Sequence, residues 1–218
     1  MTASVLIVDD EPLVSAGIAM LVNAQPGLRC VGTPVSASDA VIAVRERRPD
    51  AVLMDVRLGA LDGIEATRLV LEADPAVRVV VLTTFGSDEV VHAALRAGAS
   101  AFLTKDARPA DLVATIRRVL DDDPPLTAAT VAGIAARHAP APFRGIDVLA
   151  PLSPREREVY VLCARGLSNA EIAETAFLSE ATVKSHVGAI LTKLALRSRV
   201  QVVIHAYEHG LVGAISAI

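Results

Sequence analysis

A cluster of carboxylates follows the first apolar run of the chain. Asp9, Asp10 and Glu11 come directly after Val5-Leu6-Ile7-Val8. Like charges this close repel one another, and burying them is costly unless a positive group lies nearby. Carboxylates that face one another favour a hard divalent cation such as Mg²⁺, which takes carboxylate, water and phosphate oxygens as ligands. The sequence therefore predicts a Mg²⁺ site at this point of the chain.

Later apolar runs end in other reactive groups, namely Asp55, Thr83 and Lys105. An aspartate can act as a nucleophile and form an acyl phosphate. A cation then neutralises the charge that develops on the transferring group, and a lysine holds one of its oxygens. Each residue alone is ordinary, because a single Asp after a strand is more often a cap and a single Lys is usually solvated. Their joint placement favours phosphoryl transfer to Asp55.

Alternating apolar runs and amphipathic segments over residues 1–120 predict the elements that position these groups. The expected strands are Ser4–Val8, Leu28–Thr33, Ala51–Met54, Val77–Leu82 and Ala101–Leu103. The expected helices are Pro12–Ala24, Ser38–Arg47, Gly63–Glu72, Asp88–Ala97 and Pro109–Leu120. Pro12 suits a first helical position, Ser38 and Ser87 suit N-caps, and Gly98 suits a helix end. The alternation indicates a doubly wound α/β domain whose parallel strands end at one edge.

The rest of the chain lacks this alternation of strands and helices. Residues 122–149 are expected to form a linker, with a short helix over Thr127–His138 and a stiff spacer at Ala139-Pro140-Ala141-Pro142. Residues 150–218 are expected to form a second domain, with a helical pattern from Ser153 to the end. Their start signals are two capping boxes at Ser153 and Ser168, and further caps at Ser179 and Ser198. Short helices joined by tight turns predict a helix-turn-helix module.

The helix after Ser179 has two faces. Its apolar positions at a spacing of three and four predict a core face made of Val183, Val187, Ile190, Leu191 and Leu194. The opposite face is small, polar and cationic, as entry into a DNA major groove requires. The candidate DNA contacts on this face are Lys184, Ser185, Gly188 and Thr192, and those expected to reach phosphates are Thr182, Lys193, Arg197 and Arg199. Gly188 offers no side chain for base reading, so we expect specificity to rest on Lys184 and Ser185.

Residues 1–120 resemble a response-regulator receiver domain through Asp9, Asp10, Asp55, Thr83, Phe102 and Lys105. The resemblance implies a flavodoxin-like five-stranded sheet of order 2-1-3-4-5 and phosphorylation of Asp55 by a sensor histidine kinase. It implies Mg²⁺ ligands at Asp10, Asp55 and the backbone carbonyl of Arg57, with Asp9 acting through water. Thr83 and Phe102 would be the switch residues. Glu11 is assigned to the helix start, where it meets the positive end of the macrodipole.

One loop departs from that family. Leu58-Gly59-Ala60 stands where its members often have Met-Pro-Gly, which predicts a more mobile loop. Residues 150–213 resemble a LuxR-type DNA-binding domain, through Leu152–Val159, Gly166–Ala173 and Ser179–Val187. Together the two resemblances indicate a two-component regulator of the NarL/FixJ type. They imply double-stranded DNA, a second copy of the chain and RNA polymerase as partners.

The last helix, Arg199–His209, is where this family pairs two DNA-binding domains. We expect Val202, Val203 and Ala206 at that dimer interface, although the same side chains would also serve the domain's own core. An aspartyl phosphatase on a similar fold usually needs a second Asp two residues after the nucleophile, and here residue 57 is Arg. The protein is therefore not expected to be an enzyme beyond its own phosphorylation and dephosphorylation.

Composition bounds the remaining choices. The chain has 218 residues, a net charge of −4 and two cysteines, Cys30 and Cys163, without disulfide or metal-ligand spacing. It holds no apolar run of about 18 residues, so no membrane span is expected. It has no basic, apolar leader at its start, and we expect a cytoplasmic location. An alternative function is a phosphorylation-independent transcription regulator that a ligand or a protein partner controls.

Overall fold

A computed structural model describes residues 2–59, 61–84, 88–123 and 148–211. The chain divides into two compact units, Met1–Leu120 and Asp121–Ile218. Four expectations lie outside the described residues: the cap at Ser87, Ala60 in the departing loop, the helix over Thr127–His138 and the spacer at 139–142.

The first unit is built on a parallel sheet of five strands. Its strands are β1 (Ala3–Val8), β2 (Leu28–Gly32), β3 (Ala51–Asp55), β6 (Arg78–Thr83) and β7 (Ala101–Thr104). They lie in the order β2-β1-β3-β6-β7. Numbered along the chain this order is 2-1-3-4-5, so the predicted flavodoxin-like fold is confirmed. The labels β4 (Arg57–Leu58) and β5 (Leu61–Asp62) belong to a separate antiparallel hairpin.

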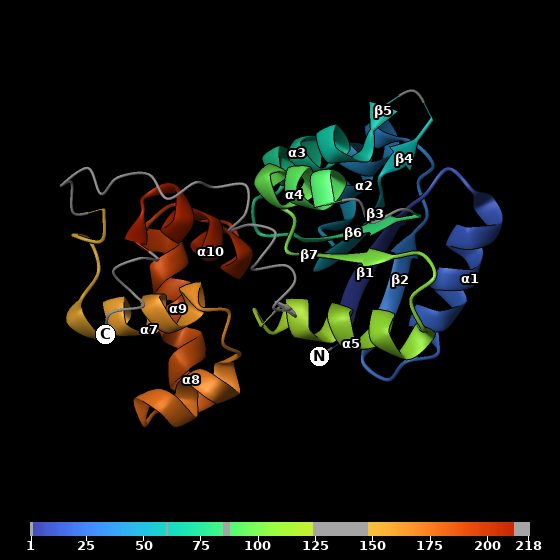
Figure 1. The fold of residues 1–218 in the computed structure, drawn as a ribbon. Helices are drawn as coiled ribbons and strands as arrows, with labels where there is room; N and C mark the ends of the chain where they lie inside the picture. The colour runs from blue at the N-terminus through green and yellow to red at the C-terminus, as the bar shows by residue number, and fades with distance from the viewer. Residues whose placement is uncertain (1, 60, 85–87, 124–147, 212–218) are drawn as a thin grey trace. The chain divides into compact units, whose positions relative to one another are not determined.

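Helices cover both faces of this sheet (Figure 1). They are α1 (Pro12–Asn23), α2 (Ala37–Arg47), α3 (Gly63–Ala73), α4 (Asp88–Ala97) and α5 (Pro109–Leu120). Helices α1 and α5 lie on one face, and α2, α3 and α4 lie on the other. Because both faces are covered, the central strands read as continuous apolar runs. Val5, Leu6, Ile7 and Val8 are accordingly at most 1% exposed.

Helix caps mostly follow the sequence signals. Pro12 begins α1, and Gly98 takes a φ of 107° after α4, as expected. The prediction for α2 was wrong by two residues, because Ser36 and not Ser38 is its N-cap. The Oγ of Ser36 accepts the backbone N–H of Asp39, which leaves Ser38 inside the first turn. Both residues are serines before the same helical pattern, so the pattern alone does not separate them.

The second unit holds α7 (Pro154–Ala164), α8 (Asn169–Ala176), α9 (Glu180–Lys193) and α10 (Arg199–Glu208). Both predicted capping boxes are present, Ser153 with Glu156 and Ser168 with Glu171. The core face predicted for α9 is confirmed: Val183, Val187 and Ile190 are at most 1% exposed, and Leu191 and Leu194 pack against the same core. Among the described residues, no helix combines the length and the hydropathy that crossing a membrane requires.

Candidate phosphoryl-acceptor site and candidate DNA interface

The crowded carboxylates meet a lysine at the edge of the sheet. Asp9 follows β1, Asp55 ends β3, and Lys105 follows β7. The Nζ of Lys105 lies 2.8 Å from Oδ2 of Asp55 and 2.9 Å from Oδ2 of Asp9. The side chains of both aspartates are at most 4% exposed. The ammonium group therefore supplies the positive charge that makes two buried carboxylates tolerable.

Burial and ion pairing act in opposite directions on these groups. Burial raises the pKa of Asp55 above its usual value of 3.8, and the hydrogen bonds from Lys105 and from the Arg57 backbone oppose that rise. Burial alone would lower the pKa of Lys105, but its ion pairs with Asp55 and Asp9 outweigh burial and raise it. Lys105 is therefore charged throughout the physiological range, as a group that binds a phosphoryl oxygen must be.

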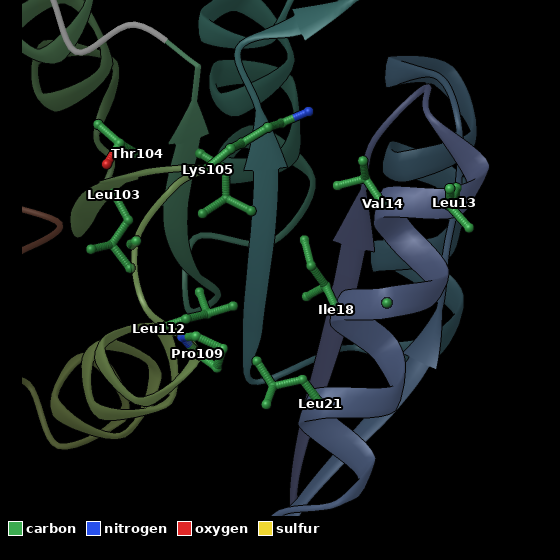
Figure 2. Close-up of a pocket in the computed structure, with 12 residues that line it drawn as sticks. Leu13, Val14, Ile18, Leu21, Leu103, Thr104, Lys105, Pro109 and Leu112 are labelled. Atoms are coloured by element: carbon green, nitrogen blue, oxygen red, sulfur yellow. The ribbon is translucent and has the colours of Figure 1, made fainter.

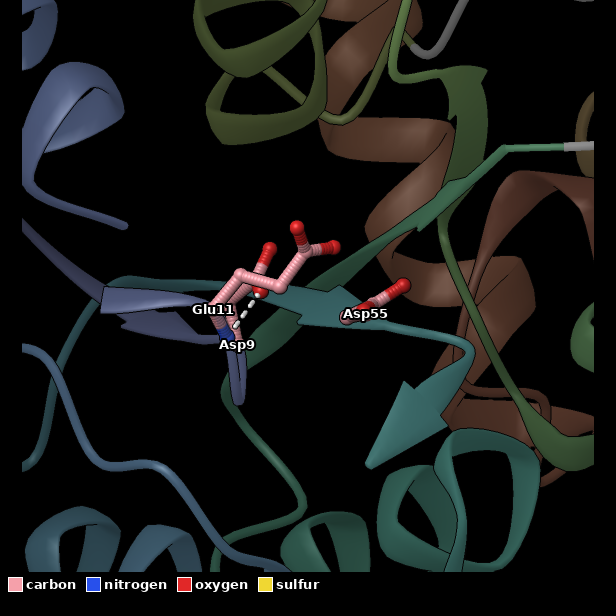
Figure 3. Close-up of side chains that lie close together, drawn as sticks. All are labelled: Asp9, Glu11 and Asp55. Atoms are coloured by element: carbon pink, nitrogen blue, oxygen red, sulfur yellow. Dashed lines mark hydrogen bonds between the residues drawn. The ribbon is translucent and has the colours of Figure 1, made fainter. Parts of the chain in front are cut away.

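Glu11 joins this group, although its position in the sequence indicated only a helix-start charge. Carboxylate oxygens of Asp9, Glu11 and Asp55 lie within 4.8 Å of one another (Figure 3). Oε1 of Glu11 lies 3.4 Å from Nζ of Lys105. Asp10 is turned elsewhere, because its Oδ2 accepts the backbone N–H of Gly59 at 3.0 Å. Glu11 is also the N-cap residue of α1, so the assignment to the helix start describes its backbone but misses its side chain.

The donor set fits a hard divalent cation. Asp9 Oδ2 is buried and makes no hydrogen bond within the part of the chain that the structure describes, although Lys105 lies beside it. Together with the neighbouring carboxylates it offers the oxygen ligands that Mg²⁺ prefers. The site can therefore hold a cation through Asp9, Asp55 and at least one more of the acidic residues around them.

The segment after Asp55 contains two short antiparallel strands, β4 and β5. Arg57 and Leu58 pair with Leu61 and Asp62. Gly59 takes a φ of 57°, a left-handed conformation that glycine adopts without steric cost. The glycine in this departing loop thus goes with a left-handed residue four positions after Asp55. The expected increase in mobility stays a prediction.

The two predicted switch residues lie on successive strands: Thr83 on β6, which pairs with the strand of Asp55, and Phe102 on β7, one strand further along the sheet. Thr83 ends β6 and is 5% exposed, and its carbonyl accepts the backbone N–H of Lys105 at 2.7 Å. Phe102 lies in β7 opposite Val81 and is partly exposed. The backbone of Thr83 is therefore joined to that of Lys105, so the two strand ends are held in register at the site.

An apolar cleft of about 310 Å³ lies between α1 and α5. Val14, Ile18 and Leu21 of α1 point toward Leu103 and Leu112 across it (Figure 2). Lys105 stands at one end of the cleft with its ammonium directed away from the apolar residues. The charged end of this lysine thus belongs to the acidic site, while its stem closes the cleft.

The predicted DNA contacts divide into exposed and occupied residues. Those that the structure leaves exposed are Thr182, Lys184, Ser185, Gly188, Thr192, Lys193 and Arg197. Lys184 pairs with Asp121 at 3.3 Å, an ion pair with both side chains well exposed. Lys193 is held by both carboxylate oxygens of Glu156, at 2.7 and 2.8 Å. Its charge is therefore already balanced inside the domain.

Arg199 was wrongly expected to reach DNA phosphates. It is 2% exposed. Its guanidinium donates to Asp123 Oδ1 at 3.1 Å, to Asn169 Oδ1 at 2.5 Å and to the carbonyl of Leu167. A buried guanidinium needs a counter-charge and hydrogen-bond acceptors, and these residues supply both. Arg199 therefore stabilises the domain and is not available to a nucleic acid.

The predicted dimer residues are also corrected. Val202, Val203 and Ala206 are each 0% exposed. Val202 and Ala206 belong to the core cluster shared with α7, α8 and α9. A fully covered side chain cannot form a contact with a second copy in this conformation. These side chains instead serve the domain's own core, which was the alternative expectation.

The comparisons with known proteins follow the same two units. The model of the response regulator receiver domain matches residues 5–117. The model described as bacterial regulatory proteins, luxR family, matches residues 150–206. The chain belongs to the two-component response regulators that carry a LuxR-type DNA-binding domain.

Relatives match along nearly the whole chain. An uncharacterized transcriptional regulatory protein, YxjL of Bacillus subtilis, is 36% identical over 210 residues, 95% of this chain and 96% of the relative. The response regulator protein VraR of Staphylococcus aureus is 32% identical over 212 residues, 97% of this chain and all of VraR. A crystal structure of a LuxR-family response regulator from Aurantimonas matches with a TM-score of 0.58 and 34% identity, covering 62% of this chain and 97% of that one. The protein is accordingly a regulator of transcription.

Proposed function

We propose that phosphorylation of Asp55 by a sensor histidine kinase switches this regulator between states that differ in dimerisation and in promoter binding. The observation that carries the proposal is the pair of contacts from Lys105 to Asp55 and Asp9 at the strand ends. A buried carboxylate with a fixed ammonium beside it and oxygen ligands for Mg²⁺ around it suits phosphoryl transfer. We further propose that the protein acts in the cytoplasm and transfers phosphoryl groups only to and from its own Asp55.

Each residue of the site has a defined task in this scheme. An oxygen of Asp55 attacks the phosphorus of phosphohistidine, and the bond between phosphorus and the histidine nitrogen breaks. Lys105 pairs with a phosphoryl oxygen. Mg²⁺, when bound, neutralises charge on the transferring group. We propose that Asp10, Asp55 and the carbonyl of Arg57 hold it, with Asp9 acting through water and with Asp10 leaving the Gly59 amide to do so.

The phosphoryl group would bias an equilibrium between two conformations. Thr83, on the neighbouring strand end, would turn its hydroxyl toward the phosphate. Phe102, which is only partly covered in β7, would turn inward into the space this opens. The second copy would then meet the first through a surface other than Val202, Val203 and Ala206, because these are buried.

The test uses a small phosphodonor and a matched variant. Acetyl phosphate with Mg²⁺ should add one phosphoryl group to the wild type, as intact-mass spectrometry measures. Asp55→Asn should take up none, because its amide is not a nucleophile. Beryllofluoride with Mg²⁺ should increase DNA affinity of the wild type but not of Asp55→Asn.

Two outcomes would count against the proposal. Phosphate retained on Asp55→Asn would place the acceptor elsewhere. DNA affinity that does not respond to beryllofluoride in the wild type would instead favour a regulator that a ligand or a protein partner controls.

A further inference from the structure

We infer that this protein reads its DNA half-site mainly through one long side chain, Lys184, with the short Ser185 beside it, and that no side chain reads the base pair facing Gly188. The inference rests on the proposed DNA-binding function and specifies which base contacts α9 makes. It concerns specificity, not the general attraction between the domain and the phosphate backbone.

The outer stripe of α9, on the side opposite its buried residues, carries mostly small side chains. Residues at a spacing of three and four line one side of a helix. On the side opposite the buried Val183, Val187 and Ile190, the exposed residues are Ala181, Lys184, Ser185, Gly188 and Thr192. Four of the five have at most three side-chain heavy atoms. Lys184 is therefore the one long side chain on this stripe.

Other polar groups near the stripe are already engaged. The hydroxyl of Thr192 donates to the carbonyl of Gly188 at 2.9 Å. The hydroxyl of Thr182 is 2.8 Å from that of Ser179, the residue that caps the helix. Lys193 lies on the flank and binds Glu156. Lys184 is therefore the cation of α9 that is best placed to reach a base edge. To do so it must give up its exposed ion pair with Asp121.

The chemistry of these side chains predicts the bases. A lysine donates to O6 and N7 of guanine, which are acceptors in the major groove, and an alanine methyl packs against the methyl of thymine. A β-carbon at Gly188 would meet no atom within 4 Å. Packing within the domain therefore does not require glycine at this position. The expected half-site has one dominant guanine, opposite Lys184, and no base preference imposed at position 188.

The experiment is a selection from random duplex DNA, using the full chain with beryllofluoride and Mg²⁺. The wild type should enrich sequences with one strongly preferred guanine. Lys184→Ala should lower the preference for guanine over other bases at that position by about 10-fold and leave the other positions unchanged. Gly188→Gln should add a preference for adenine at one further position, because glutamine pairs with N6 and N7 of adenine.

Gly188→Ala is the matched control. It also improves helix propensity but adds no hydrogen-bonding group, so it should add no base preference. Circular dichroism should show the wild-type helix content for all three variants, since both positions are exposed.

Each remaining outcome has one meaning. A guanine preference unchanged in Lys184→Ala would overturn the inference. So would an equal loss of affinity for every sequence, which would make Lys184 a phosphate contact. A Gly188→Gln selection identical to the wild type would overturn the part about Gly188. A wild type that enriches no sequence would instead overturn the proposed function.

Discussion

A β-carbon on Gly63 would lie 1.9 Å from the carbonyl oxygen of Asp55. The backbone N–H of Gly63 also donates to the carbonyl of Val56 at 2.7 Å, so the two segments are held at this distance. Helix α3 therefore begins directly against the strand end that carries the proposed phosphoryl acceptor. Only glycine, which has no β-carbon, allows the start of α3 to lie this close to the backbone of Asp55.

Gly63→Ala should destabilise the first unit by about 2 kcal/mol, because the clash is with backbone atoms that cannot rotate away. The displaced Asp55 should also bind beryllofluoride more weakly. Urea unfolding followed by circular dichroism measures the first effect, and a beryllofluoride titration with Mg²⁺ measures the second.

Gly17→Ala is the control for this variant. Gly17 is exposed in the middle of α1, and a β-carbon there would meet nothing within 4 Å. Alanine should therefore raise stability by about 1 kcal/mol through helix propensity. Equal stability changes in the two variants would contradict the close approach between Gly63 and Asp55.

The acidic neighbours of Asp55 give a second prediction, on the cation. Asp10→Asn should weaken Mg²⁺ binding by about 10-fold or more, whereas Glu11→Gln should change it little. Glu11 has a side chain that is 64% exposed, so its interaction is screened by solvent. Isothermal titration with MgCl₂ compares the two variants directly. If Glu11→Gln weakened Mg²⁺ binding more than Asp10→Asn, the third ligand would be Glu11, which lies beside Asp9 and Asp55 in Figure 3.

The receiver fold and its central residues could be predicted because local signals and topology agree. Buried parallel strands produce continuous apolar runs, and groups at their carboxyl ends must converge. That logic alone places Asp9, Asp55 and Lys105 together. It does not say which of two adjacent carboxylates turns inward, since Asp10 and Glu11 differ by contacts with distant residues, Gly59 and Lys105.

The errors in the second unit have a related cause. Arg199 reads as a surface cation because its partners, Asp123 and Asn169, lie far from it in sequence. Val202 and Ala206 repeat at helical spacing, which indicates an apolar face but not what covers that face. A spacing pattern cannot distinguish a domain core from a dimer interface, whereas burial does.

The partner of Arg199 leads to a third prediction. Asp123→Ala should lower the stability of the second unit by about 2 kcal/mol, because it leaves a buried guanidinium without its carboxylate and removes the acceptor of the Asn169 N–H. Asp121→Asn is the matched control. Its ion pair with Lys184 is well exposed, so the change should be below about 1 kcal/mol. Thermal unfolding by calorimetry resolves the two, and similar losses would refute a special role for Asp123.

The pH dependence of the second unit should come from His205. Its Nδ1 is 2.7 Å from the hydroxyl of Tyr160, and burial first, then the neighbouring His209, lowers its pKa from 6.5 to about 4. A lowered pKa means that the unfolded chain binds the proton more readily. The stability that neutral His205 contributes is therefore complete above about pH 6.5 and is lost as the pH falls toward 4.

His205→Gln should flatten the stability profile between pH 7.5 and 5, measured by urea unfolding at fixed ionic strength. Glu156 does not interfere in this range. Its bonds with Lys193 and Ser153 lower its pKa from 4.5 to about 2, so the stability it contributes is lost only below about pH 4.5. A profile equally steep in the wild type and in His205→Gln would show that another group takes up the proton.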